Sequence, residues 1–406
     1  MISNLFYKKY FDYYRIKSNV SERSLQRLLK YTAENIDYYR YLENDTLSIS
    51  KFPVVNKEIY RKTGLDSFVT KENKNKGIVR RTSGSTGSPT KIYIDKFTLA
   101  SQLFHRNKFF NLHDLSLGMS EARFWSRGKS IFYGTNNIKN ILLNRKLIND
   151  LDFFGSESQC YKNLYTLFNV IYFYGYPSLI LKAANFFENE KSRPCPKKII
   201  TTAEVLTSHD KNHIENVFNC PVIQEYGCSE VDIIAFQCKC NSYHLNPRLY
   251  IELEEVSGSG HEIIVTDLDN YYMPIIRYKM GDIVKLNDTQ CSCGIPGRTI
   301  SSICGRTSDR FIVLRDGSEI HVSAISSIIN ASNKYDSKIS KFRIDHINLD
   351  LIDIKIEGNF NHENKLYLNK ELISKLNHLL NDKITITITF SEIDNSIKHN
   401  YFKKLF

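Results

Sequence analysis

A loop rich in hydroxyl groups is the first stretch of this chain whose residue types could do chemistry. The segment "TSGSTGSPTK" (82–91) combines serines and threonines with Gly84 and Gly87 and ends in Lys91. Glycine lets a backbone approach a ligand closely, and hydroxyls with free backbone N–H groups make an anion cradle. The triphosphatase motif G-x-x-x-x-G-K-[ST] does not fit, because Pro89 stands where its second glycine is required. A flexible serine-glycine linker is the alternative.

Three later segments place a charged side chain beside a turn. In "QEYGCSE" (224–230) a strand ends in a loop that carries Glu230, and in "PIIRYKMGDIVKL" Asp282 follows a glycine, where we expect the start of a strand. In "ICGRTSDRF" Arg306 stands at the expected domain boundary. Each feature alone is ordinary in a protein surface. Their presence together, after a hydroxyl-rich glycine loop, indicates one shared site.

Two cysteine pairs and a histidine have the residue types of a metal site. "FQCKCNSYHLN" supplies Cys238, Cys240 and His244, and "QCSCG" supplies Cys291 and Cys293. Such a set can close a tetrahedral Zn²⁺ site, and four protein ligands would make that zinc structural because no position stays open. Reduced, buried thiols are the alternative interpretation.

Composition narrows the class of protein. The chain has 406 residues, of which 42% are hydrophobic and 24% charged, as in globular proteins of two or three domains. It shows neither an apolar run long enough for a membrane span nor a signal peptide, so we expect a cytoplasmic protein. The net charge of +11 is spread along the chain. This favours anionic small-molecule substrates such as nucleotides, whereas a nucleic-acid-binding protein should show a basic and aromatic recognition motif.

The elements that must position these residues form an α/β pattern. The first sixty residues read as helices, and from about 78 to 300 short strand-like runs alternate with helical ones such as "YKNLYTLFNVIYFY" (161–174). This alternation predicts a mixed or largely parallel sheet. The runs "GIVRR" and "KIYID" on either side of the hydroxyl-rich loop predict a hairpin.

The character of the sequence changes after "ICGRTSDR". A hairpin with its turn at Asp316 and Gly317 comes first, followed by a short helix from Ser323 and the order strand, strand, helix, strand. This order predicts a small α+β domain. We therefore expect a large domain over residues 1–304 and a small one over 305–406.

Read together, these segments resemble the adenylate-forming enzyme superfamily, in particular its phenylacetate-CoA ligase branch and relatives encoded with capsular polysaccharide genes. "LLKYTAENIDYYRYL", "FPVVNKEIYRK", "YGYPSLILKAA" and "CSCGIPGRTISSICGRTSD" carry the resemblance to that branch. It implies ATP-dependent activation of a carboxylic acid to an acyl-adenylate with release of pyrophosphate. The acyl group would then pass to CoA or to a sugar amine, or stay as the adenylate. A small, mobile C-terminal domain is also implied.

The resemblance assigns roles to single residues. The hydroxyl-rich loop would close over the β- and γ-phosphates of ATP through Thr82, Ser83, Gly84, Ser85, Thr86, Gly87 and Lys91. Tyr226 would lie against the adenine with Gly227 as a neighbouring ATP-binding residue, and Glu230 would hold Mg²⁺. Asp282 and Arg306 would bind the ribose. The other residues that would line the base are Ala203 and Glu204.

The resemblance also implies a structural zinc site and a catalytic lysine, and it raises the question of which residues line the acid pocket. A structural Zn²⁺ would be held by Cys238, His244, Cys291 and Cys293, with Cys240 as the alternate ligand. Lys398 would deliver a positive charge to the carboxylate and the α-phosphate, with Lys403 and Lys404 as rivals. Aromatic residues within 101–180 could line an aromatic-acid pocket or pack in the core. A catalytically inactive scaffold of the same fold is the alternative function.

Overall fold

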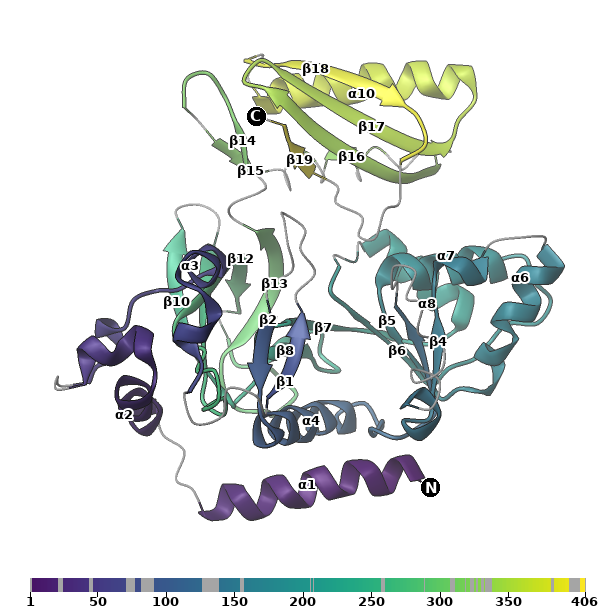
Figure 1. Ribbon diagram of the computed structural model, residues 1–406. Helices are drawn as coiled ribbons and strands as arrows, with labels where there is room; N and C mark the ends of the chain where they lie inside the picture. The colour runs from purple at the N-terminus through teal and green to yellow at the C-terminus, as the bar shows by residue number, and fades with distance from the viewer. Residues whose placement is uncertain are drawn as a thin grey trace. The chain divides into compact units, whose positions relative to one another are not determined.

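The computed structural model describes most of the chain (Figure 1). The described residues are 2–20, 25–43, 47–70, 77–81, 91–125, 139–153, 157–204, 206, 208–256, 260–287, 289–306, 311–317, 319–321, 325, 328–329, 332, 338–380, 383–393 and 402–405. They form two compact units. The first unit comprises Met1–Met280 and Val284–Ile303, and the second comprises Gly281–Ile283 and Cys304–Phe406.

An eleven-stranded sheet is the centre of the first unit within the described residues, in the order β10-β11-β12-β13-β9-β8-β7-β6-β5-β3-β4. Its parallel half contains β3 (Glu121–Phe124), β4 (Arg145–Ile148), β5 (Tyr172–Gly175), β6 (Lys198–Thr202) and β7 (Val222–Cys228). The remaining strands are β8 (Asp232–Gln237), β9 (Tyr243–Leu245), β10 (Leu249–Val256), β11 (Gly260–Asp267), β12 (Tyr278–Leu286) and β13 (Thr299–Arg306). The pairs β7–β8, β8–β9, β9–β13 and β10–β11 are antiparallel, so a mixed sheet is confirmed and a largely parallel one is wrong. Between β7 and β8, β8 and β9, and β10 and β11 the connection is only a few residues long, which permits only an antiparallel pair.

The helical start is confirmed. Its elements are α1 (Ile2–Val20), α2 (Leu25–Asn35), η1 (Asp37–Leu42), η2 (Ile49–Lys51), α3 (Lys57–Thr63) and η3 (Leu65–Phe68). Later helices of the first unit are α4 (Lys96–Asn111), η5 (Asp150–Phe153), α6 (Glu157–Leu164), η6 (Tyr165–Asn169), α7 (Pro177–Phe187) and α8 (Ser208–Phe218). The expected single helix over 161–174 is wrong, because its last residues form β5. All four residues of β5 are buried, so the strand lacks the alternation that would identify it.

The hairpin around the hydroxyl-rich loop is confirmed. Strand β1 (Ile78–Arg81) pairs antiparallel with β2 (Lys91–Ile94). The loop itself lies outside the described residues, so the roles predicted for 82–87 stay predictions.

Helices cover both faces of the parallel half-sheet. Helices α7 and α8 contribute Phe187 and Phe218 to one core, together with Phe173 of β5. Helices α1 and α4 lie against the other face, where Phe110 of α4 and Tyr7 of α1 are buried. The structure thereby places several of the aromatic residues of 101–180 in the core.

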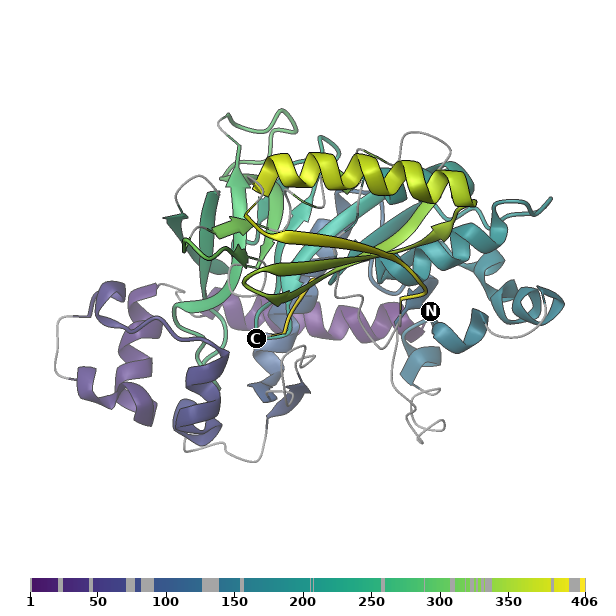
Figure 2. The ribbon, with the colours of Figure 1, turned by 90° about the horizontal axis from the view of Figure 1, so that it is seen from above.

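The second unit has its own sheet and core. Its sheet has the order β18-β17-β16-β19, and Figure 2 shows α10 (His362–Leu380) lying along it. The strands are β16 (Lys338–Asn348), β17 (Leu351–Asn359), β18 (Thr385–Phe390) and β19 (Phe402–Lys404). The hairpin of β14 (Phe311–Val313) and β15 (Glu319–His321) is confirmed, and Gly317 in its turn has a φ of 79°. The sequence did not predict β19, which pairs with the distant β16.

Most of the short helix expected from Ser323 lies outside the described residues. Among the residues that are described, no helix combines the length and apolar character needed to cross a membrane.

Candidate active site

The hairpin of β7 and β8 brings three of the predicted site residues together. Tyr226 and Gly227 lie near the end of β7, and Glu230 lies in the turn that follows. The ladder shifts register between Tyr226 and Gly227. A Cβ on Gly227 would stand 2.3 Å from the carbonyl oxygen of Asp232, closer than any real contact. Glycine is therefore required here by the close approach of the two strands.

Glu230 is a buried carboxylate held by a tyrosine. Its exposed fraction is 6%, and Tyr278 of β12 donates a hydrogen bond to Oε1 at 2.8 Å. The ring of Tyr278 stacks on Tyr60 with 5.7 Å between centroids. Burial and then the charge of Glu230 raise the pKa of Tyr278, so its hydroxyl stays a neutral donor. An oriented carboxylate of this kind suits a hard cation such as Mg²⁺.

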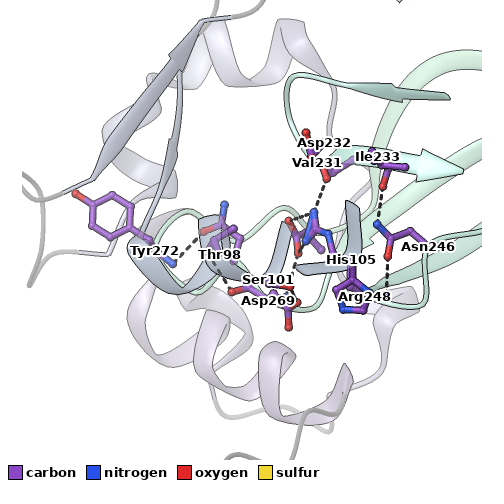
Figure 3. Close-up of polar contacts among 12 residues, drawn as sticks. Thr98, Ser101, His105, Val231, Asp232, Ile233, Asn246, Arg248, Asp269 and Tyr272 are labelled. Carbon is purple, nitrogen blue, oxygen red and sulfur yellow. Dashed lines mark hydrogen bonds and ion pairs between the residues drawn. The ribbon is translucent and has the colours of Figure 1, made fainter. Parts of the chain in front are cut away.

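A buried arginine, Arg248, holds the backbone of the turn between β7 and β8 (Figure 3). Arg248 Nη2 donates to the carbonyl oxygen of Val231, the residue after Glu230. The guanidinium also makes two hydrogen bonds to Asp267, at 2.6 Å and 2.9 Å. Both side chains are at most 1% exposed. Neither Arg248 nor Asp267 stands in one of the motifs that predict the site.

The network continues from the sheet to helix α4. The backbone N–H of Asp269 donates to Asp267 Oδ1 at 3.0 Å, and the Asp269 carboxylate accepts a hydrogen bond from Ser101. Thr98 donates to the carbonyl oxygen of Asp269 at 3.2 Å. Figure 3 shows Thr98, Ser101 and Asp269 close to Arg248. The turn that carries Glu230 is thus tied to both β11 and α4.

The other predicted ATP-binding residues are less closely grouped. Ala203 follows β6 with a φ of 69° and is exposed, whereas Glu204 accepts a hydrogen bond from the backbone of Ser178 at 3.0 Å, near the start of α7. Lys91 is the exposed first residue of β2.

The sequence predicts Asp282 at the start of a strand, and this is wrong. Asp282 lies inside β12, directly after Gly281, whose φ is 83°. Arg306 is the last residue of β13. Tyr226 Oη lies 3.5 Å from Met280 Sδ, which places β7 beside the stretch of β12 that leads to Asp282. Lys398 lies outside the described residues.

The predicted zinc ligands lie together. The ligand atoms of Cys238, His244, Cys291 and Cys293 all lie within 4.8 Å of one another. Cys238 Sγ is 3.6 Å from Cys291 Sγ, and Cys293 Sγ is 3.1 Å from His244 Nε2. The edge of a tetrahedron with Zn–S bonds of about 2.3 Å is about 3.8 Å, so the group fits the metal in size and chemistry. Cys240 is exposed and outside this group.

The thiols of this group differ in their electrostatic surroundings. A backbone hydrogen bond from Cys293 lowers the pKa of Cys291 to about 6. Burial raises the pKa of Cys238 to about 12. A bound cation would favour the thiolate form of both.

Comparisons with known proteins agree with this architecture. No protein-family model matches the chain. It is 26% identical to the protein CapK of Staphylococcus aureus over 310 residues, which are 71% of this chain and 68% of CapK.

Solved structures match more of the chain. A 2-hydroxyisobutyryl-CoA ligase in the postadenylation state, in complex with R3-HIB-AMP, matches with a TM-score of 0.72 and 18% identity, covering 94% of this chain and 88% of the ligase. The anthranilate CoA ligase AuaEII in complex with anthranoyl-AMP matches with a TM-score of 0.55 and 13% identity, covering 80% and 64%. The chain therefore has the fold of the adenylate-forming CoA ligases, and the resemblance predicted from the sequence is confirmed at this level.

Proposed function

We propose that this protein activates a carboxylic acid with ATP. The acid's carboxylate oxygen attacks the α-phosphorus, the acyl-adenylate forms, and the bond to pyrophosphate breaks. The observation that carries the proposal is the buried Glu230, held by Tyr278 in a glycine-dependent turn beside Tyr226. Matching ligases were solved with acyl-AMP and, in two structures, with 2-HIB-AMP and CoA. CoA is accordingly the first acceptor to test, ahead of a sugar amine.

Each of the proposed site residues would bind one part of ATP or stabilise charge during the reaction. Glu230 would hold the Mg²⁺ that neutralises the phosphates, Tyr226 would pack against the adenine, and Asp282 and Arg306 would bind the ribose. Lys398 would reach the reacting carboxylate. A reaction of this type depends on positioning and on fixed charges, so it requires no side-chain nucleophile.

The cysteine and histidine group would hold a structural zinc. Cys238, His244, Cys291 and Cys293 would supply four protein ligands, which leaves no position for substrate or water. The metal would join the end of β8 and strand β9 to the segment before β13. It would take no part in the transfer itself.

The sequence resemblance to relatives encoded with capsular polysaccharide genes leads us to propose a place in the synthesis of a surface polysaccharide. In that setting the activated acyl group would modify a sugar. The large domain predicted over residues 1–304 would bind ATP and acid, and the small domain predicted over 305–406 would move to deliver Lys398 and then make room for the acceptor.

Pyrophosphate release with ATP, Mg²⁺ and a panel of carboxylic acids tests the proposal. We expect acid-dependent release from the wild type and its loss in Glu230→Gln, which keeps the size of the side chain but removes the charge. Glu254→Gln is the matched control, because Glu254 is an exposed partner of Lys279. No release with aromatic, fatty, amino or sugar acids would favour the inactive scaffold. Activity of Glu230→Gln within a few-fold of wild type would exclude the Mg²⁺ role.

A further inference from the structure

A second set of charged side chains joins α4 to the β7–β8 hairpin. Arg106 of α4 donates to Glu225 of β7 at 2.6 Å and to Asp232 of β8 at 2.9 Å. Tyr174 and Thr202 both donate to Glu225 Oε1, at 2.8 Å and 3.2 Å. The buried carboxylate of Glu225 thus accepts hydrogen bonds from three side chains on the face of the sheet that α4 covers.

Two more arginines extend this set. Arg80 of β1 lies 3.9 Å from Asp232, and the guanidinium carbon of Arg123 of β3 lies 4.5 Å from the centre of the Tyr174 ring. Arg106 lies over the same ring at 5.6 Å. We call Arg80, Arg106, Arg123, Tyr174, Glu225 and Asp232 the arginine cluster.

The arginine cluster lies next to the candidate active site along the chain. Arg80, Glu225 and Asp232 each stand within two residues of a residue or loop predicted to bind ATP, and so does their partner Thr202. These residues come from four different strands, and β5, β6 and β7 run parallel with their carboxyl ends at the same edge. Ligands of open α/β sheets bind outside the carboxyl ends of the strands.

The most exposed side chains of the cluster are those of two arginines. The side chains of Arg80 and Arg123 are 25% and 24% exposed, whereas that of Glu225 is 4% exposed. The side chain of Asp232 is 19% exposed and faces Arg106 and Arg80. Burial raises the pKa of Asp232, but the positive charges of Arg106 and Arg80 outweigh this effect and lower it. Arg123 is also paired with the buried Glu121, so the polar groups that Arg80 and Arg123 can offer to a neighbouring molecule are their remaining guanidinium N–H donors.

A surface formed by these arginine side chains would discriminate between classes of carboxylic acid. An alkyl chain packed against it would remove water from the guanidinium groups and return no hydrogen bond, which is costly. A hydroxyl or carboxylate on the chain would accept those hydrogen bonds, and a carboxylate could do so in bidentate fashion. The aromatic alternative is weaker, since Phe109 stacks on Phe236 and Phe110 is buried in the core.

We propose that the arginine cluster forms a wall of the acid-binding site and selects acids whose chain carries a hydroxyl or a second carboxylate. The inference rests on the proposed acid activation and names the class of acid. The cluster also joins five strands and α4, so its test must separate selectivity from stability.

ATP–pyrophosphate exchange with butyrate, 3-hydroxybutyrate and succinate makes that separation. We expect kcat/KM to be highest for one of the two polar acids, with butyrate about 10- to 100-fold lower, as for the loss of one hydrogen bond to a charged group. Arg123→Gln and, separately, Arg80→Gln should reduce this preference at unchanged KM for ATP. Arg123→Lys should keep part of it, and Arg315→Gln, a change at an exposed arginine paired with Asp350, should keep all of it.

The outcomes are distinguishable. A wild type that prefers butyrate, or variants that lower the rates of all acids equally, would overturn the inference and leave acid activation standing. No exchange with any acid, in this set or in the wider panel, would overturn the proposed function and the inference with it. If a variant does not fold, the inference is decided by whether the wild-type protein prefers a polar acid over butyrate.

Discussion

Cys238 and Cys240 show how one residue of spacing separates a ligand from a surface thiol. Cys238 directly follows the last residue of β8 and is buried, whereas Cys240 lies in the turn toward β9 and is exposed. The backbone N–H of Cys240 donates to Cys238 Sγ at 3.3 Å, which orients that sulfur. A C-x-C pattern cannot tell the two apart, because the choice depends on where the strand ends.

Removing two of the four sulfur and nitrogen ligands should abolish metal binding. We expect the Cys291→Ser, Cys293→Ser variant to fall from about one zinc per chain to near none, since a closed structural site needs all four ligands. Its thermal midpoint should fall as well, because binding free energy contributes to folding. Metal analysis of purified protein measures the first effect and calorimetry the second. Cys195→Ser, at an exposed cysteine outside the group, is the control. Equal zinc in the wild type and the double variant would refute the site.

At the level of elements, the β7–β8 turn depends on strands that are distant in sequence. Arg248 precedes β10 directly and Asp267 ends β11, yet together they hold the carbonyl oxygen beside Glu230. A guanidinium can satisfy a carboxylate and a carbonyl at once because its donors form a rigid fork. This explains why a fully buried charge pair is tolerated under the turn.

Breaking this pair should destabilise the protein strongly. Arg248→Met leaves the Asp267 carboxylate buried without its partner, and we expect a loss of about 3–5 kcal/mol in the free energy of unfolding. Arg248→Lys should retain more stability but lose adenylation, because one ammonium cannot reproduce the fork. Denaturant unfolding and pyrophosphate exchange measure the two effects. Arg193→Met, at an exposed arginine bonded to backbone carbonyls, is the control. A loss below 1 kcal/mol in Arg248→Met would contradict this account.

The sequence predicted the elements whose signals are local. The hairpin at Asp316 and Gly317 and the turn with Glu230 could be read directly because neighbouring residues define them. The sequence pattern of β5 predicts a helix, because burial on both faces removes the alternation typical of a strand. Strand β19 has no local signal, because it pairs with a strand more than fifty residues earlier. Tyr278 and Arg248 could not be recognised for the same reason, since their partners are brought together only by the fold.

At the level of the whole molecule, each unit has a hydrophobic core of its own. In the second unit Ile344, Ile354 and Leu372 are fully buried within one cluster, and that cluster draws on β16, β17, β18, β19 and α10. A change in a polar residue near the C-terminus should therefore leave both cores intact. This makes the proposed role of Lys398 testable without loss of the fold.

Lys398→Ala should separate the two half-reactions. The adenylation step brings together a carboxylate and a polyphosphate, so the loss of one fixed positive charge should slow it by about a hundredfold or more. Acyl transfer from presynthesised acyl-adenylate to CoA has no such charge to neutralise, and we expect it to continue near the wild-type rate. Single-turnover measurements of each step distinguish the two, with Lys403→Ala and Lys404→Ala as matched variants in β19. If one of these slows adenylation while Lys398→Ala does not, the catalytic lysine is that residue, and if none does, the second unit contributes no lysine from this tail to the reaction.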